Sequence, residues 1–412
     1  MPDEPRQTQQ PPDGEGPHSE AGREFGPTAG VVTGSGELAL VLTGGGARGA
    51  YQVGLLRYLA RTYPELHLPI LSGVSAGAIN VSLLAQHHGT FRQAVSELAA
   101  LWGELMPEKI FRVDMRSLAA QVGRWGLRLT AGGMTEAHAR GLVETEPLRH
   151  FLEEALAPVN GELTGIDYNL HRGTLRAVTI STTDYTTGQS VVWVQGRDIQ
   201  TWERPGRISR QCRITVDHVM ASSALPLFFP AVQIGPHWYG DGGIKLTAPL
   251  SPALHLGASR ILAVNTRYDR SRAEAARPDV AGYPPPAQII GLLMDAIFLD
   301  SVDQDVSRME RINRVLEHVP QEHRLGMRPV ELMVMRPSQD LARIAAEYEP
   351  KLPRAFRMLT RGLGTRQTKS PDVLSMLMFQ DDYAKRLMAL GESDAARRAE
   401  EIDRFINGNA QR

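Results

Sequence analysis

The chain has 412 residues, of which 42% are hydrophobic and 22% are charged, and its net charge is −1. This composition is ordinary for a soluble globular protein, and a nearly neutral chain gives no electrostatic reason to expect nucleic acid as a partner. The single cysteine, Cys212, excludes an internal disulfide framework and suits a reducing, cytoplasmic location. We expect its thiol to be a small buried group rather than a nucleophile.

Residues 1–36 are rich in Pro, Gly, Gln and Glu and contain only scattered apolar residues. Such a segment buries too little apolar surface to offset the entropy of ordering it, so we predict a disordered tail. The tail carries Asp3 and Glu4 and lacks the apolar region of a signal peptide. No stretch reaches the ~18 apolar residues of a membrane span, because the longest run, Ile289–Met294, ends at Asp295. We expect no transmembrane segment, while peripheral contact with a membrane surface stays open.

The first ordered segment has the pattern of a strand, a glycine-rich turn, a helix and a second strand. Residues 38–43 are a short apolar run, typical of a buried parallel strand, and lead into Gly44–Gly49. Apolar residues then recur at helical spacing to about Arg61, and Pro64 separates this helix from a strand beginning at 68–71. A strand–helix–strand unit of this kind predicts a parallel sheet with a right-handed crossover.

The rest of the chain alternates between helical and strand patterns. Residues 90–160 predict a helical insertion without strands, and from about Leu341 the pattern is helical to the end. Further strands are expected at 175–181, 190–194, 231–234, 260–265 and 331–335. The alternation predicts an α/β fold, a three-layer α/β/α sandwich with helices on both faces of the sheet.

The glycine-rich turn allows two functional interpretations. Gly44, Gly46 and Gly49 spell G-x-G-x-x-G, as in a dinucleotide-binding turn, but that site needs an acidic residue at the end of the second strand. That strand instead ends in Ser72-Gly-Val-Ser75, which holds no carboxylate. A glycine turn before a helix also offers unpaired N–H groups and the positive end of the helix dipole. Its nearness to a serine turn favours a pocket for the oxyanion of an ester under attack.

The second glycine turn, Gly73-Val-Ser-Ala-Gly77, has the pattern G-x-S-x-G between a strand and a helix. This context is that of an exposed nucleophile on a sharp turn, which makes Ser75 the candidate nucleophile. Gly73 and Gly77 leave room for the turn and for close packing of the helix on the strand. The alternative is a plain strand-to-helix turn with a capping serine.

A histidine triad is the common partner of such a serine. His255, His318 and His323 follow Ser75 in the sequence, but none lies in a turn that looks built for catalysis. The glycine loop also lies only one strand–helix–strand unit before the serine, closer than in a lipase of the α/β-hydrolase type. Both observations disfavour a histidine triad.

A third turn supplies an acid. Asp241-Gly-Gly243 follows a short β-like run, and Asp-Gly alone would also fit an ordinary hairpin turn. The block Ala221–Pro230, with its Ala-Ser-Ser-Ala-Leu-Pro sequence, precedes this turn. With Gly44–Gly49 and Gly73–Gly77, these blocks follow one another in the order of the patatin-like phospholipase, or acyl hydrolase, family, which the chain resembles over 38–250.

The resemblance implies a Ser–Asp dyad without histidine, in which Ser75 is the nucleophile and Asp241 accepts its proton. The oxyanion hole would comprise backbone N–H groups of Gly44, Gly45, Gly46 and Ala76. The supporting residues would be Arg48 and Gly49 in the loop, Gly73 and Gly77 in the elbow, and Gly242 and Gly243 in the acid turn. Arg48 would brace the loop or meet an anionic headgroup, and we favour bracing. We expect neither a metal nor a cofactor.

The implied activity is that of a serine acyl hydrolase of phospholipase A type, cleaving carboxylic esters of phospholipids or acylglycerols through an acyl-enzyme. The alternatives are a broad carboxylesterase or thioesterase, and a lipid-binding regulatory protein with little turnover. The implied organisation is a tail at 1–36, a patatin-like catalytic domain at 37–340 and a helical C-terminal extension at 341–412. The insertion at 90–160 and the segment Ile289–Leu299 are candidates for lining or capping an acyl channel, and the second for touching lipid.

Overall fold

The structure is a computed structural model that describes residues 37–112, 141–277, 279–280, 282–298, 300–353, 356–358, 361 and 371–407. The predicted tail at 1–36 lies outside the described residues, as does part of the predicted insertion. Among the described residues, no helix has both the length and the apolar character needed to cross a bilayer.

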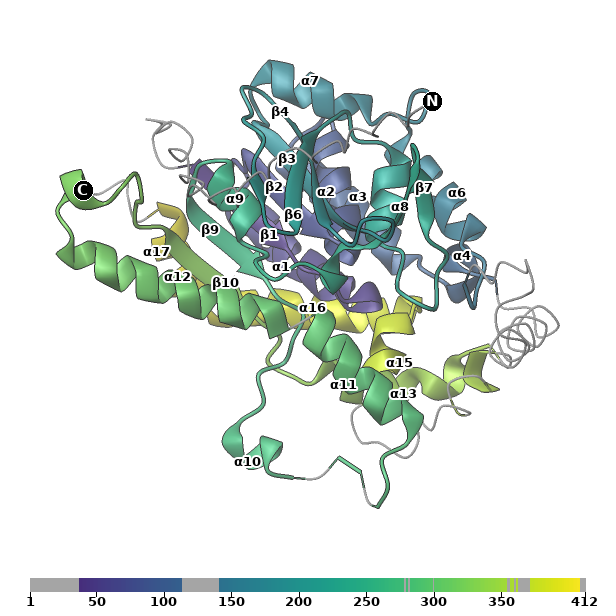
Figure 1. Cartoon of the computed structure of the whole chain (residues 1–412). Helices are drawn as coiled ribbons and strands as arrows, with labels where there is room; N and C mark the ends of the chain where they lie inside the picture. Colours follow the sequence, from purple (N-terminus) through teal and green to yellow (C-terminus); the bar gives the residue numbers. More distant parts are fainter. Residues whose placement is uncertain are drawn as a thin grey trace, which may run out of the picture. The chain divides into compact units, whose positions relative to one another are not determined.

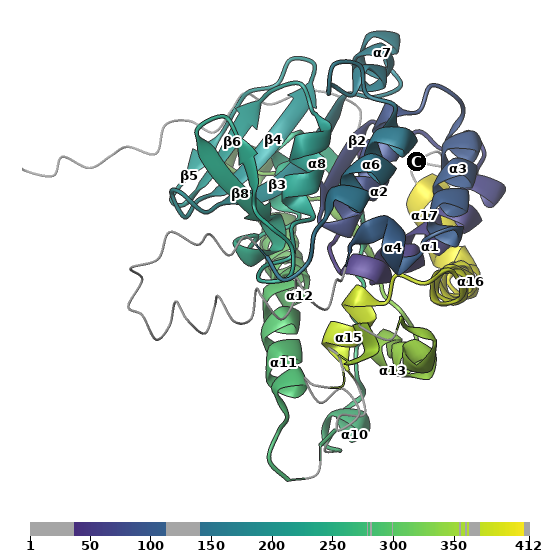
Figure 2. The ribbon, with the colours of Figure 1, turned by 90° about the vertical axis from the view of Figure 1, so that its right-hand side faces the viewer.

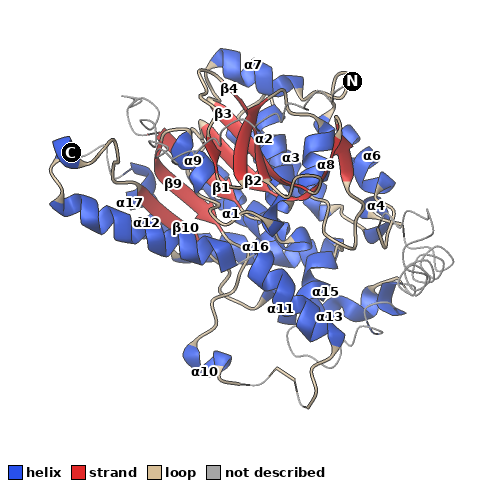
Figure 3. Cartoon of the chain, viewed as in Figure 1, coloured by secondary structure: helices blue, strands red, loops and turns tan. Residues whose placement is uncertain are grey.

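Ten strands of the described chain form one sheet (Figure 3). They are β1 (Glu37–Leu42), β2 (Ile70–Val74), β3 (Ala177–Asp184), β4 (Ser190–Gly196), β5 (Glu203–Arg204), β6 (Arg207–Gln211), β7 (Val232–Ile234), β8 (His237–Asp241), β9 (Ala258–Val264) and β10 (Glu331–Met335). The strand order is β10-β9-β1-β2-β3-β4-β6-β5, and β8 pairs with β3 and β7. The neighbours from β10 to β3 are parallel, whereas β4 and β8 run antiparallel to β3. The predicted, mostly parallel sheet is confirmed.

Helices surround this sheet (Figure 1). They are α1 (Gly49–Thr62), α2 (Ala76–Gln86), α3 (Phe91–Gly103), α4 (Pro107–Ile110), α6 (Glu146–Leu156), α7 (Thr164–Arg172), α8 (Val216–Ser222), α9 (Ser251–His255), α10 (Arg272–Ala275), α11 (Pro286–Phe298), α12 (Asp300–His318), α13 (Leu341–Tyr348), α15 (Asp372–Leu377), α16 (Asp381–Arg397) and α17 (Ala399–Asn407). Short 3₁₀ turns include η1 (Gly46–Arg48) and η2 (Gly242–Ile244).

Strand β1 shows why the sheet is covered on both faces. Successive side chains of a strand point to opposite faces, and those of β1 are apolar on both. Leu38, Leu40 and Leu42 join a large core with residues of α1, α2, α3 and α16. Ala39 and Val41 join a smaller core with residues of α9 and α12. A strand buried on both faces reads as a continuous apolar run, and the predicted α/β/α sandwich is confirmed.

Helix α16 packs along α1 (Figure 2). A Cβ atom on Gly54 would lie 2.0 Å from the carbonyl oxygen of Met388, and one on Gly391 would lie 2.2 Å from that of Tyr51. Only glycine lets the two backbones approach so closely. The Tyr51 hydroxyl also donates a hydrogen bond of 3.1 Å to Asp394.

Candidate active site

The serine elbow joins β2 to α2 at the carboxyl end of the strand. Ser75 lies between Val74 and Ala76 with φ 56° and ψ −128°, a backbone conformation that is strained for a side-chain-bearing residue. The glycines of the elbow are required by close contacts. A Cβ atom on Gly77 would lie 2.2 Å from the carbonyl oxygen of Leu42, and one on Gly73 would lie 2.5 Å from that of Gly77. This geometry is that of a nucleophile elbow.

The Ala-Ser-Ser block at the end of α8 holds this elbow in place. The Ser75 N–H donates to Ser222 Oγ at 3.0 Å, and the Ser222 hydroxyl donates to the Ser181 carbonyl of β3 at 2.7 Å. The Ser223 hydroxyl donates to the Ser75 carbonyl at 3.3 Å. The N–H and the carbonyl of Ser75 are therefore both hydrogen-bonded to this segment, which in the sequence is recognisable only as a family motif.

The glycine loop lies against the serine. A Cβ atom on Gly44 would lie 2.9 Å from Ser75 Cβ, so only a glycine fits there. Gly45 and Gly46 have φ values of 137° and 57°, which favour glycine. The Gly44 carbonyl accepts a hydrogen bond of 2.8 Å from Thr266 Oγ1. Within the described chain, the N–H groups of Gly44 and Gly45 donate to no acceptor, so they are available to an oxyanion.

Ala76 is the first residue of α2. The first N–H groups of a helix have no acceptor inside it, so the Ala76 N–H is a further candidate donor. Gly49 lets α1 begin close to this point, because a Cβ atom there would lie 2.8 Å from both Ala76 Cβ and the Trp102 ring. The loop and the elbow thus meet at one corner of the sheet.

Asp241 reaches the same corner from β8. Its carboxyl group is fully buried, and Oδ1 accepts a hydrogen bond of 2.9 Å from the Gly243 N–H. Among the described residues, Oδ2 has no hydrogen-bond partner within ordinary geometry. Burial raises the pKa of Asp241 to about 7, and the nearby Ser75 hydroxyl and the Gly243 N–H oppose this rise. The structure therefore brings the predicted acid to the predicted nucleophile.

The two glycines after Asp241 are also fixed by their neighbours. A Cβ atom on Gly242 would lie 2.2 Å from the carbonyl oxygen of Ser181. One on Gly243 would lie 2.2 Å from the ring of Phe298 in α11. A larger residue at either position would push the acid turn away from β3 or from α11.

Other nucleophiles and bases lie elsewhere. Within the described chain, no histidine is hydrogen-bonded to Ser75 or Asp241; His255 stacks on Trp202 with ring centroids 4.6 Å apart. Burial raises the pKa of Cys212 to about 12, so its thiol stays protonated at neutral pH. A site without histidine or cysteine stays a prediction.

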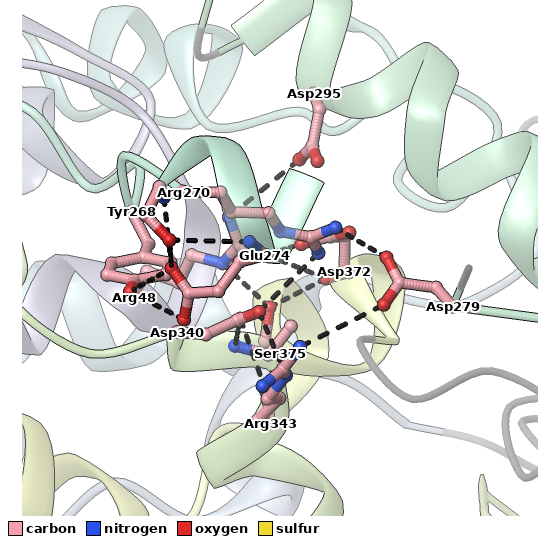
Figure 4. Close-up of polar contacts among 12 residues, drawn as sticks. Arg48, Tyr268, Arg270, Glu274, Asp279, Asp295, Asp340, Arg343, Asp372 and Ser375 are labelled. Carbon is pink, nitrogen blue, oxygen red and sulfur yellow. Dashed lines mark hydrogen bonds and ion pairs between the residues drawn. The ribbon is translucent and has the colours of Figure 1, made fainter. Parts of the chain in front are cut away.

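Arg48 ties the glycine loop to α15 and α11 (Figure 4). Its guanidinium group is 3% exposed, lies 2.6 Å from Asp372 Oδ1 and donates to Ser375 Oγ at 2.6 Å. Asp295 of α11 lies 3.8 Å away. Arg270 extends the same network to Asp340 at 3.4 Å. With its charge compensated inside the protein, Arg48 fits the bracing role better than contact with a headgroup.

The Arg48→Met variant is expected to lose about 3 kcal/mol of unfolding free energy, because it removes a buried cation and its ion pair with the half-buried Asp372. Arg57→Met is the matched control, since Arg57 of α1 is 45% exposed and its ion pair with Glu392 is worth little. Urea denaturation measures both. Equal stability of the two variants would contradict the bracing role.

A narrow apolar cavity of about 40 Å³ begins at Ser75. Its walls come from the loop and elbow, α2, α3, α4, α6, the block after α8, and the segment around α15: Gly46, Ser75, Ala76, Ile79, Leu101, Trp102, Leu105, Ile110, Leu148, Phe151, Ser223, Leu225, Phe229, Met376, Leu377 and Phe379. Ligand sites usually enclose about 300–1,000 Å³, so this cavity is much smaller than a typical ligand site.

The cavity walls test two expectations about an acyl channel. The described helices of the insertion contribute Leu101, Ile110 and Phe151, in line with a lining role. Of the segment Ile289–Leu299, the described residues 289–298 do not line the cavity, and Phe298 packs on the acid turn instead; Leu299 lies outside the described residues. The wall from Met376 was not predicted, because nothing in the sequence near 376 signals proximity to a loop some 330 residues earlier.

The chain is similar to a known protein family and to several solved structures. A family model described as patatin-like phospholipase matches residues 40–254. Among solved structures, VipD from Legionella pneumophila is 14% identical, with a TM-score of 0.35, and the match covers 86% of this chain and 67% of that one. Human GIVD cytosolic phospholipase A2 in complex with methyl gamma-linolenyl fluorophosphonate is 14% identical, with a TM-score of 0.42, covering 90% and 58%. The chain thus spans little more than half of that human protein. No curated protein sequence gave a significant match.

Proposed function

The chain belongs to the patatin-like phospholipase family, and on that premise we propose that it hydrolyses carboxylic ester bonds of lipids with Ser75 as the nucleophile. The observation that carries the proposal is the setting of Ser75. It lies on a strained elbow, beside a buried carboxylate, next to a loop with free N–H groups and at the mouth of an apolar cavity. These are the parts that acyl transfer from a lipid ester requires.

In the proposed reaction, Ser75 Oγ attacks the carbonyl carbon of the ester while Asp241 Oδ2 takes the hydroxyl proton. The N–H groups of the glycine loop, Gly44, Gly45 and Gly46, and of Ala76 stabilise the negative charge that develops on the carbonyl oxygen. Collapse of the tetrahedral intermediate expels the alcohol, to which Asp241 returns the proton. Water, deprotonated by Asp241, then attacks the acyl-Ser75 ester, and Asp241 returns that proton to Ser75 Oγ as the fatty acid is released. A base with a pKa of about 7 suits this cycle better than an ordinary Asp.

The substrate class proposed is a phospholipid or an acylglycerol, cleaved as by a phospholipase A. The apolar lining of the cavity beside Ser75 favours an acyl chain over a small polar acyl group, and the cavity of about 40 Å³ would have to widen to admit one. We also propose that 37–340 forms the catalytic domain and 341–412 its C-terminal extension, with α15 of the extension completing the cavity wall. The cytoplasmic location remains a prediction from the sequence.

The first test is covalent labelling of the full chain by a fluorophosphonate probe. Labelling of the wild type and its loss in Ser75→Ala are expected, together with release of fatty acid from long-chain phospholipid. Hydrolysis of short-chain esters or thioesters alone would favour a broad esterase. Absence of labelling in a folded protein that binds lipid would favour a regulatory lipid-binding protein.

A further inference from the structure

Helix α11 is apolar on both sides. Its inner side packs in the core, where Met294 and Phe298 are each 5% exposed. Its outer side carries Ile289, Leu292 and Leu293, which are 43%, 60% and 56% exposed. These positions follow the i, i+3, i+4 spacing of a helix face, and no charged residue interrupts them. We call Ile289, Leu292 and Leu293 the α11 stripe.

An exposed apolar face on a helix whose opposite face is buried in the core is unusual for a surface helix, and contiguous exposed apolar surface marks an interaction site. α11 has 13 residues, too few to span a bilayer, for which about 20 are needed. Tyr283 precedes the helix and is 90% exposed, and tyrosine favours the boundary between lipid and water. The stripe and Tyr283 therefore have the chemistry of a surface that lies on a membrane rather than across it.

The α11 stripe lies at the edge of the sheet where the active site is. The carboxyl end of β9 leads into the segment of α10 and α11, and the parallel strands β1 and β2 end at the same edge with the glycine loop and Ser75. The inner side of α11 touches the acid turn through Phe298, and Arg48 joins α11 to α15 at the cavity wall. Figures 1 and 2 show α10 and α11 extending from this edge, away from the strands.

The charges near α11 favour an anionic surface. Lys245, at the end of η2, and Arg272 and Arg277, in and after α10, are exposed and have no ion-pair partner among the described residues. Most acids of the segment are used internally: Glu274 binds Tyr268 and Ser271, and Asp279 pairs with Arg270. Asp269 is the exposed exception. The surplus of free cations is small, so apolar contact is the main source of binding.

We propose that the α11 stripe and Tyr283 dock the chain on a lipid surface and place the edge of the sheet that carries Ser75 toward it. This inference rests on the proposed function, because a lipid surface is the source of the substrate. It adds which residues make the contact and which edge of the molecule faces the lipid.

The test is flotation of the full chain with phosphatidylcholine vesicles, with and without phosphatidylglycerol, in the Ser75→Ala background so that the lipid stays intact. The double variant Leu292→Gln/Leu293→Gln is expected to bind at least about tenfold more weakly, because it lacks the two leucine side chains that binding would transfer from water into the lipid. The matched control is Ile312→Gln/Val315→Gln in α12, where the residues are 42% and 61% exposed. The control is expected to bind as the parent does, and phosphatidylglycerol to strengthen binding modestly.

Equal vesicle binding by the α11 and α12 variants would overturn the proposal. A dimer that the α11 substitutions dissociate, with no vesicle binding by the parent, would also overturn it and assign the stripe to a second copy. With Ser75 intact, the α11 variant is expected to keep its hydrolysis of a water-soluble short-chain ester and to lose activity on vesicles. If the α11 variant loses vesicle binding but no protein with Ser75 intact hydrolyses any ester, the proposed function is rejected and the docking surface stands.

Discussion

Replacing Ser75 by Ala is expected to lower kcat/KM for ester hydrolysis by at least about 10³-fold, because it removes the hydroxyl that is proposed to form the acyl-enzyme. The hydroxyl is the only group that the substitution removes, and both backbone groups of residue 75 keep their partners in α8. The fold should therefore survive. Steady-state hydrolysis of a short-chain ester and circular dichroism of the same sample measure the two properties together.

Ser82→Ala is the matched control for this variant. Ser82 also belongs to the elbow helix α2, is fully buried, and its hydroxyl has no hydrogen-bond partner among the described residues. Its removal should leave kcat/KM within about twofold of the wild type, as expected for a site outside the chemistry. Ester hydrolysis by Ser75→Ala at the rate of this control would rule out Ser75 as the nucleophile.

The wild-type rate is expected to rise about tenfold per pH unit below pH 7 and to level off above it. Burial raises the pKa of Asp241 to about 7, and only its ionised form can accept the serine proton. Asp241→Asn should lose at least about 10²-fold in kcat/KM and lose this dependence on pH. The profile of kcat/KM from pH 5 to about pH 9 tests both statements. A wild-type profile that is flat from pH 5 to pH 9 would contradict a base whose pKa is raised to about 7.

The same carboxyl group makes stability depend on pH. A folded-state pKa raised above the unfolded value means that the folded state binds the proton more tightly, so this contribution to stability is complete below about pH 4 and is lost as the pH rises through 7. Asp241→Asn removes the contribution. The unfolding free energy of Asp241→Asn minus that of the wild type should therefore increase from pH 4 to pH 8, by on the order of 3–4 kcal/mol. Urea titrations at the two pH values measure this difference, and Asp269→Asn, at an exposed acid, is the control.

The parallel part of the sheet was predictable because its strands carry strong local signals. β1, β2 and β9 are apolar runs bounded by glycine or polar turns, and the helix between β1 and β2 repeats its apolar residues at helical spacing. Strands β5 and β6 were not predicted. Their sequences, Glu-Arg and Arg-Ile-Ser-Arg-Gln, lack the alternation of a half-buried strand, and the pairing of β6 with β4 is what makes them strands.

The sequence by itself determined the order of the family motifs and predicted the parts of the proposed chemistry. Three short turns predict the donor loop, the serine and the acid. A strained elbow and a tight oxyanion loop need glycines at fixed positions, and these glycines form a motif that can be recognised in the sequence. Only the tertiary structure decided how those parts are held and enclosed. The carboxyl of Asp241 reaches Ser75 because β8 pairs with β3 beside β2, and burial there raises its pKa. Arg48 pairs with Asp372, and Met376 lines the same cavity as Gly46. In each case the two residues are more than 300 positions apart in the sequence. Contacts between segments so far apart leave no periodic trace in the sequence, because each depends on how the whole chain packs.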